Sequence, residues 1–434
     1  GVTKVYDGTT TAPTGFVPSF TWLGFITGDT AASTSHTAAN YNSARVNSAN
    51  QITVNGLALT GSITGSATTG SLISDYAMDA NSKTVAATIT PKTLTATISN
   101  SGVSKVYDGS TAAPTGFAPA YTWSGLVSGD TSAALSNTGS AYNSKDVSAA
   151  NQMTVNGLVL SNVTGNNSSV VSDYAMDATS KTVAASITPK TLTATVTAPS
   201  KTYDGTTTAT PTLTITPAGF VTGETVTASG TASFNSKNVN EANLVTVNTT
   251  TLTNGNNGGL SSNYHLPAGQ TVAANISRRD LTLTAPQVIK TYDGTTTALT
   301  SSANISNSVP VVSSGALAAN DSLTGSSLLF DTPRAGNNKT VTVGQAVIKD
   351  SLNADMGSNY NTTYAANTSS TINPKTLTPS LGNTGVTKVY DSNTTAPTGF
   401  APQFNFSGLV AGDTTATLTS TGSSYNSANV TTAT

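Results

Sequence analysis

The sequence predicts an all-β chain of tandem antiparallel β-sandwiches, and three observations carry this prediction. Hydrophobic residues alternate with threonine in short segments such as Leu94, Ala96 and Ile98, which is the period of a strand with one buried face. No segment places apolar residues at the helical spacing i, i+3, i+4, i+7 over three turns, so helix is not expected. A Tyr-Asp-Gly motif at residues 6–8 returns along the chain and divides it into units of domain size.

The motif Lys-x-Tyr-Asp-Gly sets the length of the repeat. Its copies begin at Lys4, Lys105, Lys201, Lys290 and Lys388, and the last copy carries Ser392 in place of glycine. Successive tyrosines lie 89 to 101 residues apart, which is the size of a small domain and too long for one coil of a solenoid. We therefore expect five repeats: residues 1–91 (without the first strand), 92–189, 190–278, 279–374 and a truncated 375–434.

The second repeat shows the expected order of elements. An alternating strand at 92–98 is followed by a short strand at 103–107, which Asp108-Gly109 ends because this pair favours a tight turn. Alternation at 121–123 leads to a turn at Gly129-Asp130. A longer strand, or a hairpin that pivots at Asn156-Gly157, comes next, and alternating Val183, Ala185 and Ile187 close the repeat before Pro189.

About seven short strands in each repeat, with turn signals about every 8–12 residues, are typical of an immunoglobulin-like antiparallel sandwich. The repeats follow one another through short junctions such as Pro91-Lys92, without Gly/Ser linkers. We therefore expect the units to stack end to end as a fairly stiff, elongated rod.

Composition limits the classes of partner. Charged residues make up 9% of the chain and the net charge is -2, which argues against nucleic acid and anionic membranes as partners. No apolar run of about 20 residues is present, so a membrane span is not expected.

Cysteine is absent, which suits an exported bacterial protein. The chain opens at Gly1 inside a repeat, and we interpret it as a window of a longer protein.

Five landmarks recur in order: Lys-x-Tyr-Asp-Gly-Thr-Thr, Gly-Asp, an aromatic-Asn-Ser triplet, Asp/Asn-Tyr, and Ile-x-Pro-Lys-x-Leu-Thr. This series resembles the bacterial YDG repeat and the related MBG-type immunoglobulin-like repeats. The resemblance covers essentially the whole chain. Such repeats occur in large exported adhesins similar to filamentous haemagglutinin that use two-partner secretion. The resemblance thus implies a non-enzymatic stalk or fibre outside a Gram-negative cell.

The fourth repeat departs from the pattern. It has Asn320-Asp321 for Gly-Asp and Phe330-Asp331-Thr332 for the aromatic-Asn-Ser triplet. We expect structural variants at these positions and transfer no shared ligand role to them.

We predict no catalytic, cofactor-binding or metal-binding residue from the sequence. His36 and His265 occupy unrelated positions and lack partners at metal-ligand or triad spacing. The recurring acids Asp108, Asp130 and Asp173 are the best candidates for Ca²⁺. Each lies where a turn favours an Asx side chain, and other residues replace them in some repeats, namely Glu224, Asn263 and Asn359. We expect turn roles and no tight metal requirement.

The recurring aromatic residues permit a sugar-binding surface, but core packing is the expectation. Tyr107, Tyr174, Tyr203 and Tyr264 should be buried, with hydroxyl groups bonded to backbone as in a tyrosine corner. Trp22 and Trp123 occupy equivalent strands, where the fifth repeat has Phe404 or Phe406, and these rings are also expected in the core.

Two functions from different classes lead, and an enzyme is third because no nucleophile, base or metal set stands out. The first is an extracellular adhesin stalk whose neighbouring repeats are its main partners, with any host or surface ligand bound elsewhere in the full-length protein. The alternative is a self-assembling filament. The first repeat lacks its opening strand and the fifth its closing third, so either further chain or strands from an adjacent copy would complete them.

Overall fold

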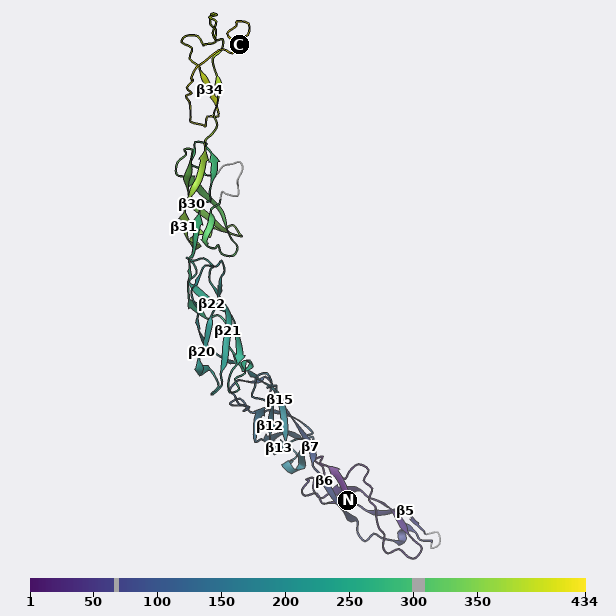
Figure 1. Cartoon of the computed structure of the whole chain (residues 1–434). Coiled ribbons are helices and arrows are strands. Elements are labelled where there is room, and N and C mark those ends of the chain that lie inside the picture. The colour runs from purple at the N-terminus through teal and green to yellow at the C-terminus, as the bar shows by residue number, and fades with distance from the viewer. Residues whose placement is uncertain (66–69, 299–308) are drawn as a thin grey trace. The chain divides into compact units, whose positions relative to one another are not determined.

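The computed structural model describes residues 1–65, 70–298 and 309–434. Within these residues the regular elements are β-strands and short 3-10 turns (Figure 1), so the predicted all-β class is confirmed. The chain divides into two compact units. The first unit comprises Gly1–Thr193, Ile215–Thr227 and Leu252–Pro267, and the second comprises Ala194–Thr214, Ala228–Thr251 and Ala268–Thr434. The third repeat thus contributes to both units.

The first repeat forms a four-stranded sheet in the order β1-β6-β4-β3 and a separate pair, β2-β5. Its elements are β1 (Val2–Val5), β2 (Ala31–Ser35), β3 (Ala38–Tyr41), β4 (Gln51–Asn55), β5 (Ala58–Thr64), the turn η1 (Ile73–Asp75) and β6 (Ser82–Thr90).

The second repeat contains the fullest set of strands in the first unit. Its sheets run β11-β12-β15-β8, β14-β7-β9 and β10-β13. The elements are β7 (Lys92–Ile98), β8 (Val103–Val106), β9 (Tyr121–Ser124), β10 (Asp130–Ser136), β11 (Gly139–Tyr142), β12 (Gln152–Asn156), β13 (Val159–Gly165), η2 (Val171–Asp173), β14 (Tyr174–Met176) and β15 (Ser180–Thr188). Residues 20–23 and 76–78 of the first repeat match β9 and β14 and form no strand, since no counterpart of β7 lies between them.

Most strands of the third repeat are short, but two of them, β21 and β22, are long. The elements are β16 (Lys190–Thr191), β17 (Ala194–Thr197), β18 (Lys201–Thr202), β19 (Thr208–Ala209), β20 (Thr212–Ile215), η3 (Pro217–Gly219), β21 (Val226–Phe234), β22 (Leu244–Asn254), η4 (Ser261–Asn263), β23 (Tyr264–His265), β24 (Thr271–Ala273) and β25 (Ile276–Ser277).

The fourth repeat combines the sheets β28-β26-β31 and β27-β32-β30-β29, whereas the fifth has one pair, β33-β34. The elements are β26 (Arg279–Thr284), β27 (Ile289–Thr291), β28 (Val311–Gly315), β29 (Asp321–Phe330), β30 (Gly336–Asp350), η6 (Gly357–Asn359), β31 (Tyr360–Ala365), β32 (Asn367–Asn373), β33 (Thr378–Leu381) and β34 (Phe404–Ser407).

The sheets are mixed rather than purely antiparallel, which amends the predicted pairing. The opening strand pairs in parallel with a strand near the end of the same repeat, as β7 does with β14 and β26 with β31. The Tyr-Asp-Gly strand does the same, with β8 parallel to β15 and β27 parallel to β32. Parallel pairs need a long crossover, and the intervening strands of each repeat supply it.

The suggested hairpin at Asn156-Gly157 is absent. β12 pairs with β11 and β15, whereas β13 pairs with β10, so the chain passes from one sheet to another at this point. The alternating residues still mark buried faces, because Leu94 and Ala96 of β7 and Met153 and Val155 of β12 are fully buried.

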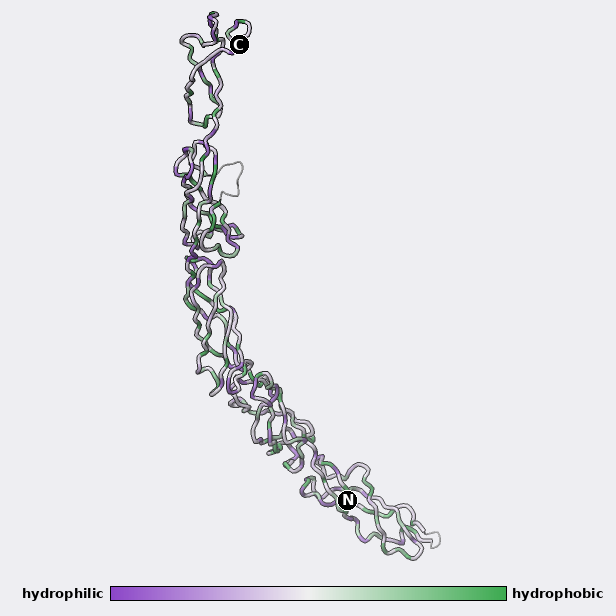
Figure 2. The backbone as a smooth tube through the Cα atoms, in the orientation of Figure 1, coloured by the Kyte–Doolittle hydropathy of each residue, from purple (hydrophilic) through white to green (hydrophobic). Residues whose placement is uncertain are grey.

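Hydrophobic and hydrophilic residues are interspersed along the described parts of the backbone (Figure 2), as half-buried strands require. Among the described residues, no helix is long and apolar enough to cross a membrane.

Candidate functional site: the interface between consecutive repeats

The Lys-x-Tyr-Asp-Gly motif folds into a turn held by its own side chains. Lys105 Nζ donates to Asp108 Oδ1 at 2.7 Å and to the Ser110 carbonyl at 2.9 Å, and the Ser110 N–H donates to the same Asp108 oxygen at 2.9 Å. Burial alone raises the pKa of Asp108, but the bonds from Lys105 and Ser110 outweigh burial and hold the pKa below its usual range. The turn role predicted for Asp108 is confirmed.

The lysine also connects this turn to the aromatic-Asn-Ser motif of its own repeat. Lys105 Nζ lies 5.5 Å from the centre of the Tyr142 ring, a cation–π contact. The other repeats place the lysine in the same way over an aromatic ring: Lys4 over Tyr41, Lys201 over Phe234, Lys290 over Phe330 and Lys388 over Tyr425. Two recurring motifs of the sequence therefore form one contact inside each repeat.

The motif tyrosine instead contacts the next repeat. The Tyr107 ring packs edge-on against Tyr264, with 5.4 Å between the centroids and 80° between the planes. Both hydroxyls donate to the Glu224 carboxylate, Tyr107 at 2.7 Å and Tyr264 at 2.8 Å. Tyr107 is 1% exposed and Glu224 is 7% exposed. A buried carboxylate requires such donors, and here the second and third repeats each supply one.

The same arrangement recurs between the third and fourth repeats. Tyr203 and Tyr360 lie edge-on at 5.4 Å, and both donate to Asp321, at 3.0 Å and 2.7 Å. Asp321 belongs to the variant Asn320-Asp321 pair, for which the sequence predicted no shared role. In the structure it takes the place of Glu224. Asn320 has φ +71° and Gly223 has φ +88°, so asparagine adopts the left-handed backbone that glycine provides elsewhere.

The interface between the first and second repeats includes one more hydroxyl. Tyr6 and Tyr174 lie edge-on at 5.5 Å, and Tyr174 donates to Asp130 at 2.5 Å. Ser169 lies between Tyr6 and the acid, 2.6 Å from the Tyr6 hydroxyl and 2.6 Å from Asp130 Oδ2. Ser169 donates its one hydroxyl proton to Asp130, so it accepts the proton of the Tyr6 hydroxyl, which itself accepts from Arg45 Nη1 at 2.6 Å. The side chain of Asp130 thus accepts hydroxyls rather than turn amides, which corrects the role predicted for it.

The tyrosine against which the motif tyrosine packs, here called the receiving tyrosine, also binds the backbone of its own repeat. The hydroxyl of Tyr174 accepts the Val127 N–H at 2.9 Å, that of Tyr264 accepts the Val221 N–H at 3.0 Å, and that of Tyr360 accepts the Ala318 N–H at 2.8 Å. The predicted burial of Tyr107, Tyr174, Tyr203 and Tyr264 is confirmed. The predicted bond between hydroxyl and backbone is confirmed for Tyr174 and Tyr264 but wrong for Tyr107 and Tyr203, whose hydroxyls donate to carboxylates. What the sequence did not indicate is that Tyr107 and Tyr203 are buried by the following repeat.

Burial and the neighbouring carboxylate raise the pKa of the interface tyrosines. Burial and the hydrogen bond to Glu224 raise the pKa of Tyr107 well above its usual range. Burial raises the pKa of Tyr264 to about 12, opposed by the hydrogen bond from Val221 and aided by Glu224. Both hydroxyls therefore stay protonated and donate at neutral pH.

The glycine of the motif is required twice, by conformation and by space. Gly109 has φ +79°, and a Cβ there would lie 2.7 Å from Cγ1 of Val221 in the next repeat. Gly8 approaches Val127 in the same way, with 3.1 Å from a built Cβ to Cγ1. In the fifth repeat, Ser392 keeps the left-handed backbone with φ +68°. The glycine therefore shapes the turn and lets the next repeat approach.

Two further motif tyrosines serve as internal comparisons. Tyr292 and Tyr390 have no counterpart of Tyr174 after them within residues 1–434, and Tyr292 is half-buried while Tyr390 is 58% exposed. Burial of the motif tyrosine thus accompanies the presence of a complete following repeat.

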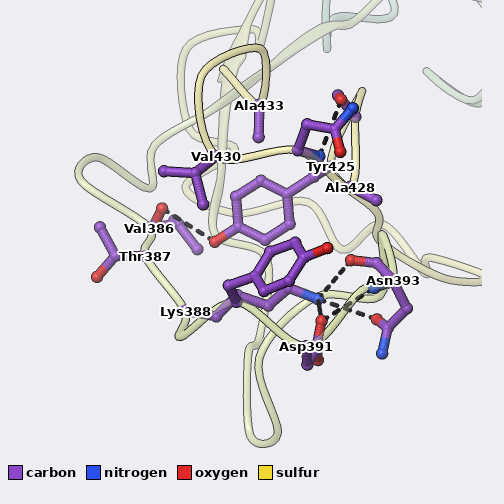
Figure 3. A pocket seen from close by; sticks show the side chains of 12 residues that line it. Val386, Thr387, Lys388, Asp391, Asn393, Tyr425, Ala428, Val430 and Ala433 are labelled. Carbon is purple, nitrogen blue, oxygen red and sulfur yellow. Dashed lines mark hydrogen bonds and ion pairs between the residues drawn. The ribbon is translucent and has the colours of Figure 1, made fainter.

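A pocket of about 210 Å³ lies beside Tyr390 in the fifth repeat, and Figure 3 shows Val386, Lys388, Tyr425 and Val430 in its lining. Residues 386–388 match β8, which pairs with β15 in the second repeat. No counterpart of β15 occurs within residues 375–434. The pocket therefore lies against a strand position that a closing strand covers in the second repeat, and we assign it no ligand.

The other candidates from the sequence do not gather into a site. His36 and His265 are both exposed and belong to different repeats. Across the described ranges, no group of three His, Cys, Asp or Glu side chains could hold a metal ion. Trp22 and Trp123 are half-buried rather than fully in the core, as are Phe404 and Phe406. Of the buried acids and amides in the described residues, Asp130, Asp173, Glu224, Asn263 and Asn359 lie at the repeat interfaces.

The sequence model of the YDG domain matches residues 1–81, 90–182, 188–272, 277–369 and 373–434. The chain belongs to the YDG domain family. The five matches include every copy of the Lys-x-Tyr-Asp-Gly motif, so this motif of the YDG domain is also the part that contacts the next domain. A comparison with curated proteins gives no match.

Proposed function

We propose that this array of YDG domains is a non-enzymatic spacer of an exported bacterial surface protein, a stalk that holds a functional region away from the cell. The repetition of one buried interface at three consecutive domain boundaries carries the proposal. A spacer needs domains whose mutual orientation is fixed, and buried, hydrogen-bonded contacts restrict that orientation more than a flexible linker does.

The connections between domains support the same function. β6 ends at Thr90 and β7 begins at Lys92, so Pro91 alone separates the strands of the first two domains. Pro189 separates β15 from β16 and Arg278 separates β25 from β26 in the same way. Linkers of one residue leave little freedom for bending, and proline restricts it further.

The surface chemistry fits a passive extracellular role. Only 9% of the residues are charged, so solubility depends on threonine, serine and asparagine, which are uncharged at any external pH. Location outside the cell and secretion through a two-partner system rest on the resemblance to exported adhesins. Protease treatment of intact cells tests the location: a surface stalk is cleaved, whereas a protein inside the cell is protected until lysis.

Sedimentation velocity and small-angle scattering of the whole chain test the spacer function. We expect a monomer with a high frictional ratio at every concentration, because neighbouring domains of one chain satisfy the interfaces. Ordered fibres that grow with concentration would favour the alternative, a self-assembling filament joined by strand exchange. A compact monomer, or hydrolysis of a glycan or peptide library by the purified protein, would overturn both.

A further inference from the structure

Each described domain interface contains a second buried contact, formed by the residue before the receiving tyrosine. Asp173, Asn263 and Asn359 hold this position, and their exposed fractions are 0%, 0% and 1%. Each side chain accepts a valine N–H from the preceding domain: Val46 at 3.0 Å, Val147 at 2.9 Å and Val239 at 2.9 Å. This part of the contact is the same at all three boundaries.

The residue before that valine differs between the boundaries: an arginine lies opposite Asp173, whereas Asp146 and Asn238 lie opposite asparagine. At the first boundary, Arg45 Nη1 donates to Asp173 Oδ2 at 3.0 Å. The Val170 N–H also donates to Asp173 Oδ2, at 2.9 Å, and the Val46 N–H to Oδ1. Every group around this side chain is a donor, so a carboxylate fits, because it only accepts.

At the other two boundaries the preceding domain offers an acceptor. Asn263 Nδ2 donates to Asp146 Oδ1 at 2.9 Å, and Asn359 Nδ2 donates to Asn238 Oδ1 at 3.2 Å. An asparagine fits here because one end of its amide accepts the valine N–H while the other end donates. A carboxylate at position 263 would instead face the Asp146 carboxylate in a buried site, which is strongly unfavourable.

We propose that this residue pair determines which YDG domain can follow which. A domain with arginine before the valine accepts a following domain with Asp before its tyrosine, and a domain with Asp or Asn there accepts one with Asn. The edge-on tyrosine contact is common to the three boundaries, whereas this pair differs between them and selects the neighbour by donor and acceptor type. The selection goes beyond the spacer function, since a spacer could be built from identical interfaces.

The rule also specifies which neighbouring domain would fit at the three positions of this kind that have no partner residue within residues 1–434. Arg334 holds the place of Arg45 in the fourth domain, with Ala335 supplying the N–H in place of valine, and fits a following domain with Asp. Asp75 holds the place of Asp173 in the first domain, is exposed here, and fits a preceding domain with arginine. Asn429 in the fifth domain fits Asn.

Hydrogen exchange of the whole chain tests the rule at the second boundary. In Asn263→Asp, we expect the Val147 amide to exchange at least about tenfold faster at pH 7, since the two carboxylates force the interface open. Adding Asp146→Arg recreates the pair of the first boundary and should return exchange to within about threefold of the wild type. Asn166→Asp makes the same charge change at an exposed side chain and should leave Val147 unaffected.

The double variant decides the outcome even if the single one unfolds locally. Rescue by Asp146→Arg supports selection by the pair. A double variant that exchanges as fast as Asn263→Asp would overturn the proposal, and so would a single variant that exchanges like the wild type. The reciprocal change at the first boundary, Arg45→Asp with Asp173→Asn, should be tolerated better than Arg45→Asp alone. Amides of β30 in the fourth domain report whether any variant has unfolded throughout.

Discussion

Tyr107 donates a hydrogen bond to Glu224 across a domain boundary, with 2.7 Å between the phenolic oxygen and Oε1. Tyr264, of the same domain as Glu224, holds the other carboxylate oxygen. Separating the two domains would leave a largely buried acid with one tyrosine donor and expose an apolar ring. At this boundary the two domains therefore share a buried contact that neither of them forms alone.

Replacing Gly109 by alanine should destabilise the second boundary by about 1–3 kcal/mol more than the matched change Gly116→Ala. Both glycines have left-handed backbone, φ +79° and φ +80°, so both variants carry the conformational strain. A Cβ at Gly109 meets Val221 at 2.7 Å, whereas one at Gly116 has no neighbour within 4 Å. Urea unfolding of the two variants measures the difference. Equal losses would show that the next domain does not approach this turn.

Alkaline pH should weaken the same boundary. Burial and Glu224 raise the pKa of Tyr107, and burial raises that of Tyr264 to about 12, so both stay protonated in the folded chain. An unfolded tyrosine ionises near pH 10, so above it the unfolded state binds fewer protons. The free energy of unfolding then falls by about 1.4 kcal/mol per pH unit for each such tyrosine. Urea titrations from pH 8 to 12 check this, and Tyr107→Phe should show a shallower fall.

Acid should weaken the motif turn slightly. Burial raises the pKa of Asp204, but the bonds from Lys201 and Thr206 outweigh it and keep the pKa low. A carboxyl with a depressed folded pKa stabilises above its unfolded value of about 4, and this stability is lost as pH falls through the folded pKa. The Asp204 side chain is 45% exposed, so the loss should stay below about 1 kcal/mol. Asp204→Asn should remove this part of the difference between the urea midpoints at pH 6 and pH 2.5; an unchanged difference would exclude the ion pair as its source.

The sequence was sufficient for the all-β class and for the burial of the tyrosines, because both depend on local patterns. Alternation along a strand reports a buried face, and an aromatic residue that recurs beside such strands belongs to an interior. It was not sufficient for the parallel pairing of β7 with β14, since strand direction is decided by partners about 80 residues away.

The interface itself was harder to predict because its parts are spread over two domains. Asp130 and Glu224 follow glycine at a turn and so resemble turn residues. Only the folded chain places Glu224 beside tyrosine hydroxyls from two domains, and connects Asp130 to Tyr6 of the preceding domain through Ser169. One signal was present in the sequence: Arg45 is followed by Asp173 before the next tyrosine, whereas Asp146 and Asn238 are followed by asparagine there. Pairing the two variable positions across the repeat boundary would have indicated their contact.

Hydrogen exchange of the Tyr107→Ala variant tests most directly whether consecutive domains complete each other. Removing the ring should cost about 3–5 kcal/mol, as other large-to-small core changes do. If the account is correct, amides of the third domain, including Val221, exchange faster along with those of the second, while Tyr390→Ala, at a 58% exposed ring, leaves exchange elsewhere unchanged. Faster exchange confined to the second domain, with Val221 as protected as in the wild type, would contradict it.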